Sequence, residues 1–209
     1  MKCKNCRKSV THTINCLCVS CYVDENLPTK VNDTSWIVAF CSYGRGKEAK
    51  SKTNSDIDES LATAIVDEKI TIEKDKKTIL IQTENDVLSI AITIENIDSL
   101  AQKSGVLIGK WLIYRTASEI DSAWKAIAEN TWSGKLTSCA KVSTSAQKSK
   151  RHVICVYTDN YLDSEDVKRI REKLRNLGFG EELCYKPDVY TYLGIYYRTS
   201  SLSPCRYRM

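Results

Sequence analysis

The sequence predicts an α+β protein in which an antiparallel sheet is backed by helices. Short apolar or alternating segments separated by polar turns are typical of antiparallel strands. Two longer segments instead repeat apolar residues at helical spacing. With 209 residues, the chain can form one well-buried domain of about 150 residues and a small appendage. We therefore expect a separate segment at 1–30 and one domain at 31–209.

The clearest pair of strands surrounds a basic loop. Segment 138–144 alternates, so that Ala140 and Val142 should face away from Lys141, and segment 153–157 is continuously apolar. The basic residues of this region are Lys141, Lys148, Lys150, Arg151 and His152. Such a hairpin can gather several donors around a phosphate or carboxylate. A solvated surface loop is the alternative interpretation.

Further strands and loops follow from composition. Segment 44–60 is polar and predicts a mobile loop, 62–66 a short helix, and 199–209 a frayed basic tail. The other strands are expected at 36–43, 69–73, 78–83, 87–94, 109–114 and 185–197.

Two helices have clear end signals. Thr116 and Glu119 have capping-box spacing and precede the apolar stripe Ile120, Trp124 and Ile127. A second helix is expected at 164–177, begun by Asp163 and ended by Gly178. Its apolar stripe should be Val167, Ile170, Leu174 and Leu177. We expect its basic residues Lys168, Arg171 and Arg175 to be solvated, partly paired with glutamates.

The last expected strand, 185–197, is rich in tyrosine. In an extended chain Tyr190, Tyr192 and Tyr196 would share one face, with Gly194 allowing a close approach of a ligand or another backbone. Together with Lys141, His152 and Lys186, Tyr190 and Tyr192 would line a concave sheet face. A half-buried core role is the alternative for these tyrosines.

The first 30 residues contain two C-x-x-C pairs. Cys3, Cys6, Cys18 and Cys21 can surround a tetrahedral Zn²⁺, with Cys16 and His12 as spare candidates. Because so short a segment has almost no core, zinc would be structural and supply its folding energy. Disulfides or free thiols are the alternative. The segment could contact nucleic acid or dock a protein partner.

Composition and charge narrow the class of protein. No apolar stretch approaches the ~20 residues that span a bilayer, and no signal-type segment follows the N-terminus. We therefore expect a cytoplasmic or nuclear protein, whose ten cysteines bind metal or are buried rather than paired. Residues 141–209 hold 13 lysines and arginines against 8 acidic residues, which favours anionic partners.

From Gly109 onward the chain closely resembles the Bles family (basophilic leukaemia expressed protein and relatives). The resemblance covers about half of the chain. It rests on the runs G-K-W-L-I-Y, A-K-V-S-T, H-V-I-C-V-Y-T-D, D-V-K-R-I-R-E-K-L-R-N-L-G and Y-K-P-D-V-Y-T-Y-L-G-I-Y. That family is similar in fold to the mRNA cap-binding translation initiation factor, which implies a strongly curved antiparallel sheet backed by helices. The cysteine-rich segment lies outside the resemblance.

The resemblance also implies a phosphate site. In the cap-binding factor the corresponding strand, loop and strand hold the cap phosphates with basic residues, which would here be Lys148, Lys150 and Arg151. The factor encloses the cap base between two tryptophans beside a glutamate. Residues 90–104 contain no Trp-Glu pair, and the only tryptophan before 109 is Trp36. Recognition of methylated guanine is therefore not expected.

Three functions remain open. The first is a binding module whose concave sheet face takes a phosphorylated ligand, a nucleotide or an RNA end, because cations hold phosphate while aromatic rings stack on bases. The second follows from relatives named as phosphothreonine lyases, with Lys141 as base and His152 as acid. The third is a zinc-containing adaptor for protein partners. Whether the chain is an enzyme is left open.

Overall fold

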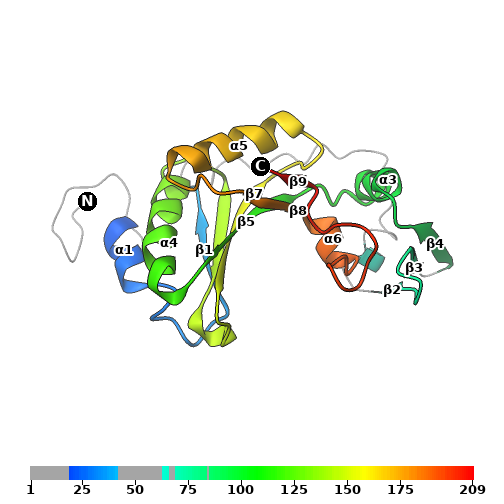
Figure 1. Cartoon of the computed structure of the whole chain (residues 1–209), viewed down its shortest axis with the longest axis horizontal. Coiled ribbons are helices and arrows are strands. Elements are labelled where there is room, and N and C mark those ends of the chain that lie inside the picture. Colours follow the sequence, from blue (N-terminus) through cyan, green and yellow to red (C-terminus); the bar gives the residue numbers. More distant parts are fainter. Residues whose placement is uncertain (1–18, 42–62, 66–68, 84) are drawn as a thin grey trace. The chain divides into compact units, whose positions relative to one another are not determined.

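The structure is a computed structural model that describes residues 19–41, 63–65, 69–83 and 85–209 (Figure 1). Of the sequence predictions, the loop 44–60 and most of the cysteine-rich segment lie outside these residues. The chain divides into two compact units. Unit 1 comprises 1–47, 111–157 and 169–181; unit 2 comprises 48–110, 158–168 and 182–209.

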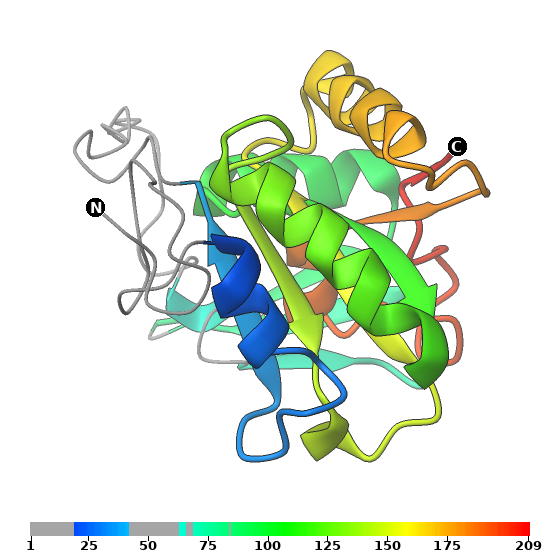
Figure 2. The same cartoon turned by 90° about the vertical axis from the view of Figure 1, so that its left-hand side faces the viewer.

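Unit 1 is built on antiparallel strands in the order β1-β6-β7-β5. The bounds are β1 Trp36–Phe40, β5 Gly109–Arg115, β6 Cys139–Ser143 and β7 His152–Thr158. Its helices are α1 Val19–Glu25 and α4 Ala117–Trp132, together with most of α5 Ser164–Asn176. Figure 2 shows α1 and α4 side by side across one face of the sheet. The expected strands of this unit are confirmed, except that β1 ends at Phe40 and residues 42–43 of the expected strand 36–43 lie outside the described residues.

Local signals set the helix ends as expected. The Glu119 carboxylate accepts from the Thr116 backbone N–H at 3.1 Å, which completes the capping box of α4. Ile120, Trp124 and Ile127 are at most 1% exposed and form the buried stripe. At the start of α5, Asp163 accepts from the backbone amides of Glu165 and Asp166.

Arg171 departs from its expected place on the solvated face of α5. Its side chain is fully buried, and its guanidinium donates to the carbonyl oxygens of Phe179 at 2.7 Å and Glu181 at 2.6 Å. The guanidinium carbon also lies 5.9 Å from the centre of the Trp111 ring. Burial lowers the pKa of Arg171, and the nearby charge of Arg175 adds to this. Arg171 is therefore a structural residue that ties α5 to the chain following it.

Unit 2 contains the antiparallel meander β2-β3-β4, which confirms the expected strands of this region. The bounds are β2 Ile70–Ile72, β3 Thr78–Gln82 and β4 Val87–Ala91. Sequence analysis missed the helix α3 Ile94–Ser104. Its signals were local: Thr93 accepts from the Asn96 amide at the start, and Gly105 closes the end with a φ of 69°.

The C-terminal part of unit 2 corrects two predictions. Segment 185–197 is not one strand: β8 Cys184–Pro187 is followed by the helix α6 Asp188–Tyr192, with Gly194 at a φ of 68° beyond it. Pro187 lacks an N–H and occupies the N-cap of α6, so the extended pairing ends there. Residues 199–209 are not frayed, because β9 Tyr207–Arg208 pairs with β8.

Candidate functional site

One face of the unit 1 sheet carries the predicted cation Lys141. The register places Lys141 opposite Val38 of β1 and Cys155 of β7, so these residues share a face. Ala140 and Val142, on the other face, are fully buried. By strand alternation, the face of Lys141 comprises Trp36, Val38, Phe40, Cys139, Ser143, Val153, Cys155 and Tyr157 as well. We call this set the open face.

The open face combines a cation with aromatic rings. The Lys141 ammonium lies 4.4 Å from the centre of the Trp36 ring and 5.6 Å from that of Tyr157. Such distances are typical of cation–π contacts. Lys141 makes no ion pair within the described part of the chain, and none of the residues of the open face is a carboxylate. Within the described residues, its positive charge is therefore not neutralised by a carboxylate.

Apolar side chains next to Lys141 remain in contact with solvent. Phe40 is 52% exposed and Val38 is 44% exposed, although both belong to a sheet strand. At the other end of the region, the Arg151 guanidinium lies 5.5 Å from the Tyr114 ring, which is itself 45% exposed. Arginine stacked on an exposed ring forms a second pair of cation and aromatic group.

The basic loop has an anchored base and exposed cations. Its 3₁₀ turn, Ser145–Gln147, is held by the Ser145 backbone N–H, which donates to the Pro28 carbonyl, and by the Gln147 side-chain amide, which donates to the Ser35 carbonyl. Lys148 follows with a φ of 51°, and Lys148, Lys150 and Arg151 are exposed. The structure thus presents these three predicted phosphate ligands to solvent, beside a fixed turn.

His152 does not join this group. It shares its face of β7 with Ile154, which pairs with Val142, and the open face lies on the other side of the sheet. The imidazole is 5% exposed, and Nδ1 lies 3.0 Å from the Ser143 carbonyl oxygen. Lys141 and His152 therefore point to opposite faces. This corrects the prediction that His152 lines the binding face, and separates the expected base from the expected acid.

The other predicted ligand residues lie in unit 2. The Lys186 ammonium is buried, donates to the Ile195 carbonyl at 2.9 Å and lies 3.5 Å from the centre of the Tyr196 ring. Burial lowers its pKa to about 8, and the positive charge of Lys110 acts in the same direction. Lys186 is thus held in the interior of unit 2 rather than on a binding face.

Tyr190 and Tyr192 do not form the expected row of phenols. Two residues apart on the helix α6, they point in different directions: Tyr190 is 1% exposed and Tyr192 is 37% exposed. Burial raises the pKa of Tyr190 to about 12. Tyr190 is therefore a core residue, and of the two only Tyr192 is available to a ligand.

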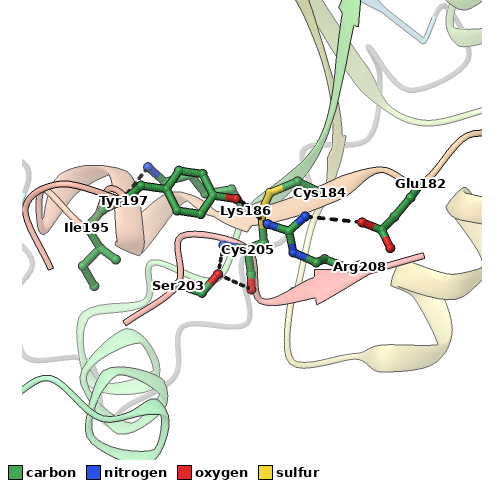
Figure 3. Close-up of a disulfide and its surroundings, with 8 residues drawn as sticks. All are labelled: Glu182, Cys184, Lys186, Ile195, Tyr197, Ser203, Cys205 and Arg208. Atoms are coloured by element: carbon green, nitrogen blue, oxygen red, sulfur yellow. Dashed lines mark hydrogen bonds and ion pairs between the residues drawn. A yellow bond between two sulfur atoms is a disulfide. The ribbon is translucent and has the colours of Figure 1, made fainter. Parts of the chain in front are cut away.

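Within the described residues two cysteines form a disulfide, whereas the sequence favoured metal binding and burial over disulfides. Cys184 of β8 is bonded to Cys205, and their Cα atoms are 5.3 Å apart (Figure 3). The Tyr197 hydroxyl lies 3.2 Å from Cys205 Sγ, and Arg208 pairs with Glu182 at 3.3 Å. The bond closes the segment that contains α6. It adds to the pairing of β8 with β9 in ordering the C-terminal residues.

The zinc prediction is not tested by this structure. Cys3, Cys6 and Cys18 lie outside the described residues, and Cys21 is half-buried in α1. The part of the chain that is described contains no cluster of three metal-ligating side chains. The set Cys3, Cys6, Cys18 and Cys21 stays a prediction, for which metal analysis of the purified protein should find one zinc per chain.

A small cavity lies on the helix side of unit 1. It has a volume of about 130 Å³ and is enclosed by α1, β1 and α4, including the rings of Tyr22, Trp124 and Trp132. None of the described residues that line it is charged. This cavity does not suit a phosphorylated ligand, in contrast to the open face.

Sequence analysis missed the aromatic partners of the open face. Trp36 and Tyr157 lie on two strands, β1 and β7, and only the hairpin residue Tyr157 is close to Lys141 in sequence. The register of β1 against β6 joins residues more than 90 positions apart. No local pattern could have found the contact between Lys141 and Trp36.

These features define an α+β protein with a cation-bearing antiparallel sheet face that is partly exposed within the described residues. The family described as basophilic leukemia-expressed protein Bles03 matches residues 29–194, and the chain belongs to this family. The family resemblance seen in the sequence is thereby confirmed. Among the described residues, no helix is both long and apolar enough to cross a bilayer.

Two solved structures of cap-binding proteins are similar to the chain. One is described as schistosome eIF4E complexed with m7GpppA and 4E-BP: the identity is 15%, the TM-score 0.40, and the match covers 63% of this chain and 69% of that chain. The other is Ascaris suum eIF4E-3 with an m2,2,7G cap: the identity is 16%, the TM-score 0.38, and the coverage 63% and 68%.

Proposed function

We propose that the open face is a binding site for a phosphorylated ligand, a nucleotide or an RNA end. The observation that carries this proposal is the position of the Lys141 ammonium between the rings of Trp36 and Tyr157. A phosphate binds best to a cation that is not already paired with a carboxylate. Among the described residues, Lys141 makes no such pair.

Both parts of a nucleotide have a partner at this site. Charge-assisted hydrogen bonds from lysine or arginine hold phosphate oxygens. When Lys141 turns to a phosphate, the Trp36 and Tyr157 rings become available to a base, and stacking on an aromatic ring contributes about 1–3 kcal/mol per base. The exposed loop cations Lys148, Lys150 and Arg151 would extend the contact along an RNA backbone.

The same residues argue against selectivity for a methylated cap. N7-methylated guanine carries a positive charge, and the open face has a cation and no carboxylate to receive it. Stacking alone tolerates any base. We therefore propose that the ligand is recognised by its phosphate and by a base of any kind.

Replacing Lys141 by alanine should weaken binding of guanosine triphosphate and of short single-stranded RNA about tenfold, the usual effect of losing one charge-assisted hydrogen bond. Fluorescence titration measures this effect. Lys135→Ala is the matched control, because Lys135 is an exposed lysine in the turn after α4 and lies outside the open face. Circular dichroism should show that both variants keep the fold, since Lys141 lies outside the buried core.

Two outcomes would reject this function. Equal loss of affinity in Lys141→Ala and Lys135→Ala would show that only the overall charge matters. Absence of binding by the unmodified protein would leave the protein adaptor as the better interpretation. Methylated cap analogue is included as a third probe, and we expect it to bind no more tightly than guanosine triphosphate.

The phosphothreonine lyase interpretation receives no support from the site. An elimination of that kind needs a base and an acid beside one substrate. Lys141 and His152 point to opposite faces of the sheet, and His152 is buried against the Ser143 carbonyl. A binding function without turnover is therefore the proposal.

A further inference from the structure

Unit 2 contains a pocket that is separate from the residues of the open face. It has a volume of about 550 Å³ and lies between the β2–β3 turn and the C-terminal end of α6, which are neighbours in Figure 1. The volume is within the range of sites for small molecules, roughly 300–1,000 Å³. The lining residues are Ile70, Ile72, Glu73, Lys74, Lys76, Thr191, Tyr192, Leu193, Gly194, Arg198 and Thr199.

The lining has an excess of positive charge. Lys74, Lys76 and Arg198 are all exposed, and Glu73 is the one carboxylate among the lining residues. Within the described residues none of these three cations makes an ion pair. Two point charges and one planar guanidinium around the same space suit an anion with several oxygens.

An apolar wall completes the pocket. Thr191 also lines the pocket, although its Oγ1 is enclosed and out of reach of solvent. Ile70, Ile72 and the exposed ring of Tyr192 provide the surface for an apolar group.

The two walls of the pocket are held together. The Ser201 backbone N–H donates to the Lys76 carbonyl at 3.0 Å and joins the two walls, while Thr199 Oγ1 donates to the Gly194 carbonyl at 2.5 Å within one wall. The wall from Thr191 to Thr199 also lies within the segment closed by the Cys184–Cys205 disulfide. The backbone segments that carry Lys74, Lys76 and Arg198 are therefore held in place by these bonds.

We propose that this pocket binds a phosphate monoester that carries a small apolar or aromatic group. Arg198, Lys74 and Lys76 hold the phosphate, and the apolar group lies on Tyr192 and Ile72. A doubly charged phosphate interacts with several cations more strongly than a singly charged carboxylate does. This site does not depend on the function proposed for the open face.

Ligand binding to this pocket can be tested on the full-length protein by measuring the acetylation of individual lysines with mass spectrometry. Phenyl phosphate should protect Lys74 and Lys76, whereas Lys77, which is adjacent and exposed but does not line the pocket, should react as before. Inorganic phosphate should protect the same two lysines more weakly, and benzoate should protect them least. Lys141 reports on the open face in the same spectra.

Three variants sharpen the test. Arg198→Gln should raise the phenyl phosphate concentration for half protection about tenfold, and Lys103→Gln, which removes the same charge from an exposed site on α3, should leave it unchanged. Tyr192→Ala should weaken protection by phenyl phosphate but not by inorganic phosphate.

Several results would overturn the proposal. One is that phenyl phosphate protects Lys77 from acetylation as strongly as it protects Lys74 and Lys76. A second is that Arg198→Gln and Lys103→Gln change the concentration for half protection equally. A third is that benzoate protects the two lysines as well as phenyl phosphate does. Protection of Lys141 without Lys74 and Lys76 would reject the pocket while supporting the open face, and the reverse pattern would support the pocket alone.

Discussion

Replacing Arg171 by methionine should lower the free energy of unfolding by about 2–4 kcal/mol. Methionine can fill much of the space of the side chain, but it has no donor for the carbonyl oxygens of Phe179 and Glu181. Each buried acceptor left without a partner costs about 1–3 kcal/mol. The stacking of the guanidinium on Trp111 is lost as well. Urea denaturation followed by circular dichroism measures the change.

Arg175→Met is the control for this experiment. Arg175 lies four residues later on the same helix, is exposed and pairs with Glu172. An exposed pair of this kind contributes about 0–1 kcal/mol. If the two variants lost equal stability, the carbonyl contacts of Arg171 would not be the source of its effect.

Loss of the Cys184–Cys205 bond should cost about 3 kcal/mol. Cross-linking residues that are 21 positions apart removes conformational entropy from the unfolded chain, and a loop of this length gives an effect of that size. The double variant Cys184→Ser, Cys205→Ser should therefore unfold at a lower urea concentration than the unmodified protein. Reductant should lower the stability of the unmodified protein toward that of the variant and leave the variant unchanged.

The disulfide prediction has its own chemical check. Tryptic digestion without reductant should yield one cross-linked species joining the peptides that contain Cys184 and Cys205. Cys139→Ser serves as the control, because Cys139 is on the open face and is not disulfide-bonded. If the cross-linked species were absent and reductant had no effect on stability, the bond would not form in solution.

Sequence alone determined the elements whose signals are local. The capping box at Thr116 and Glu119, the buried stripe of Ile120, Trp124 and Ile127, and the alternation around Lys141 depend on residues within one helix or strand. Spacings of two and of 3.6 residues are set by backbone geometry, so these predictions needed no knowledge of the rest of the chain. The family resemblance rests on runs of residues in the sequence and likewise needed no structure.

Predictions were wrong where one local pattern fits two structures. The tyrosines of 185–197 alternate as in a strand, yet Pro187 ends β8 and α6 follows it. The spacing of Arg171 is that of a solvated residue of α5. Its guanidinium is nevertheless buried, because it donates to the carbonyl oxygens of Phe179 and Glu181, which follow the helix. The place of Arg171 depends on what packs against the helix, whereas Pro187 is a local signal that the prediction of one long strand did not use.

The candidate sites belong to the tertiary structure. Lys141 was found from its hairpin, but its contact with Trp36 depends on strand pairing between distant residues, and the face of His152 depends on the register of β6 with β7. The pocket of unit 2 joins a turn near residue 75 to a helix end near residue 193. The sequence provides the charged and aromatic side chains, but the register of distant strands decides which of them come into contact. Side chains alternate between the two faces of a sheet, so a shift of the register by one residue moves each side chain to the opposite face.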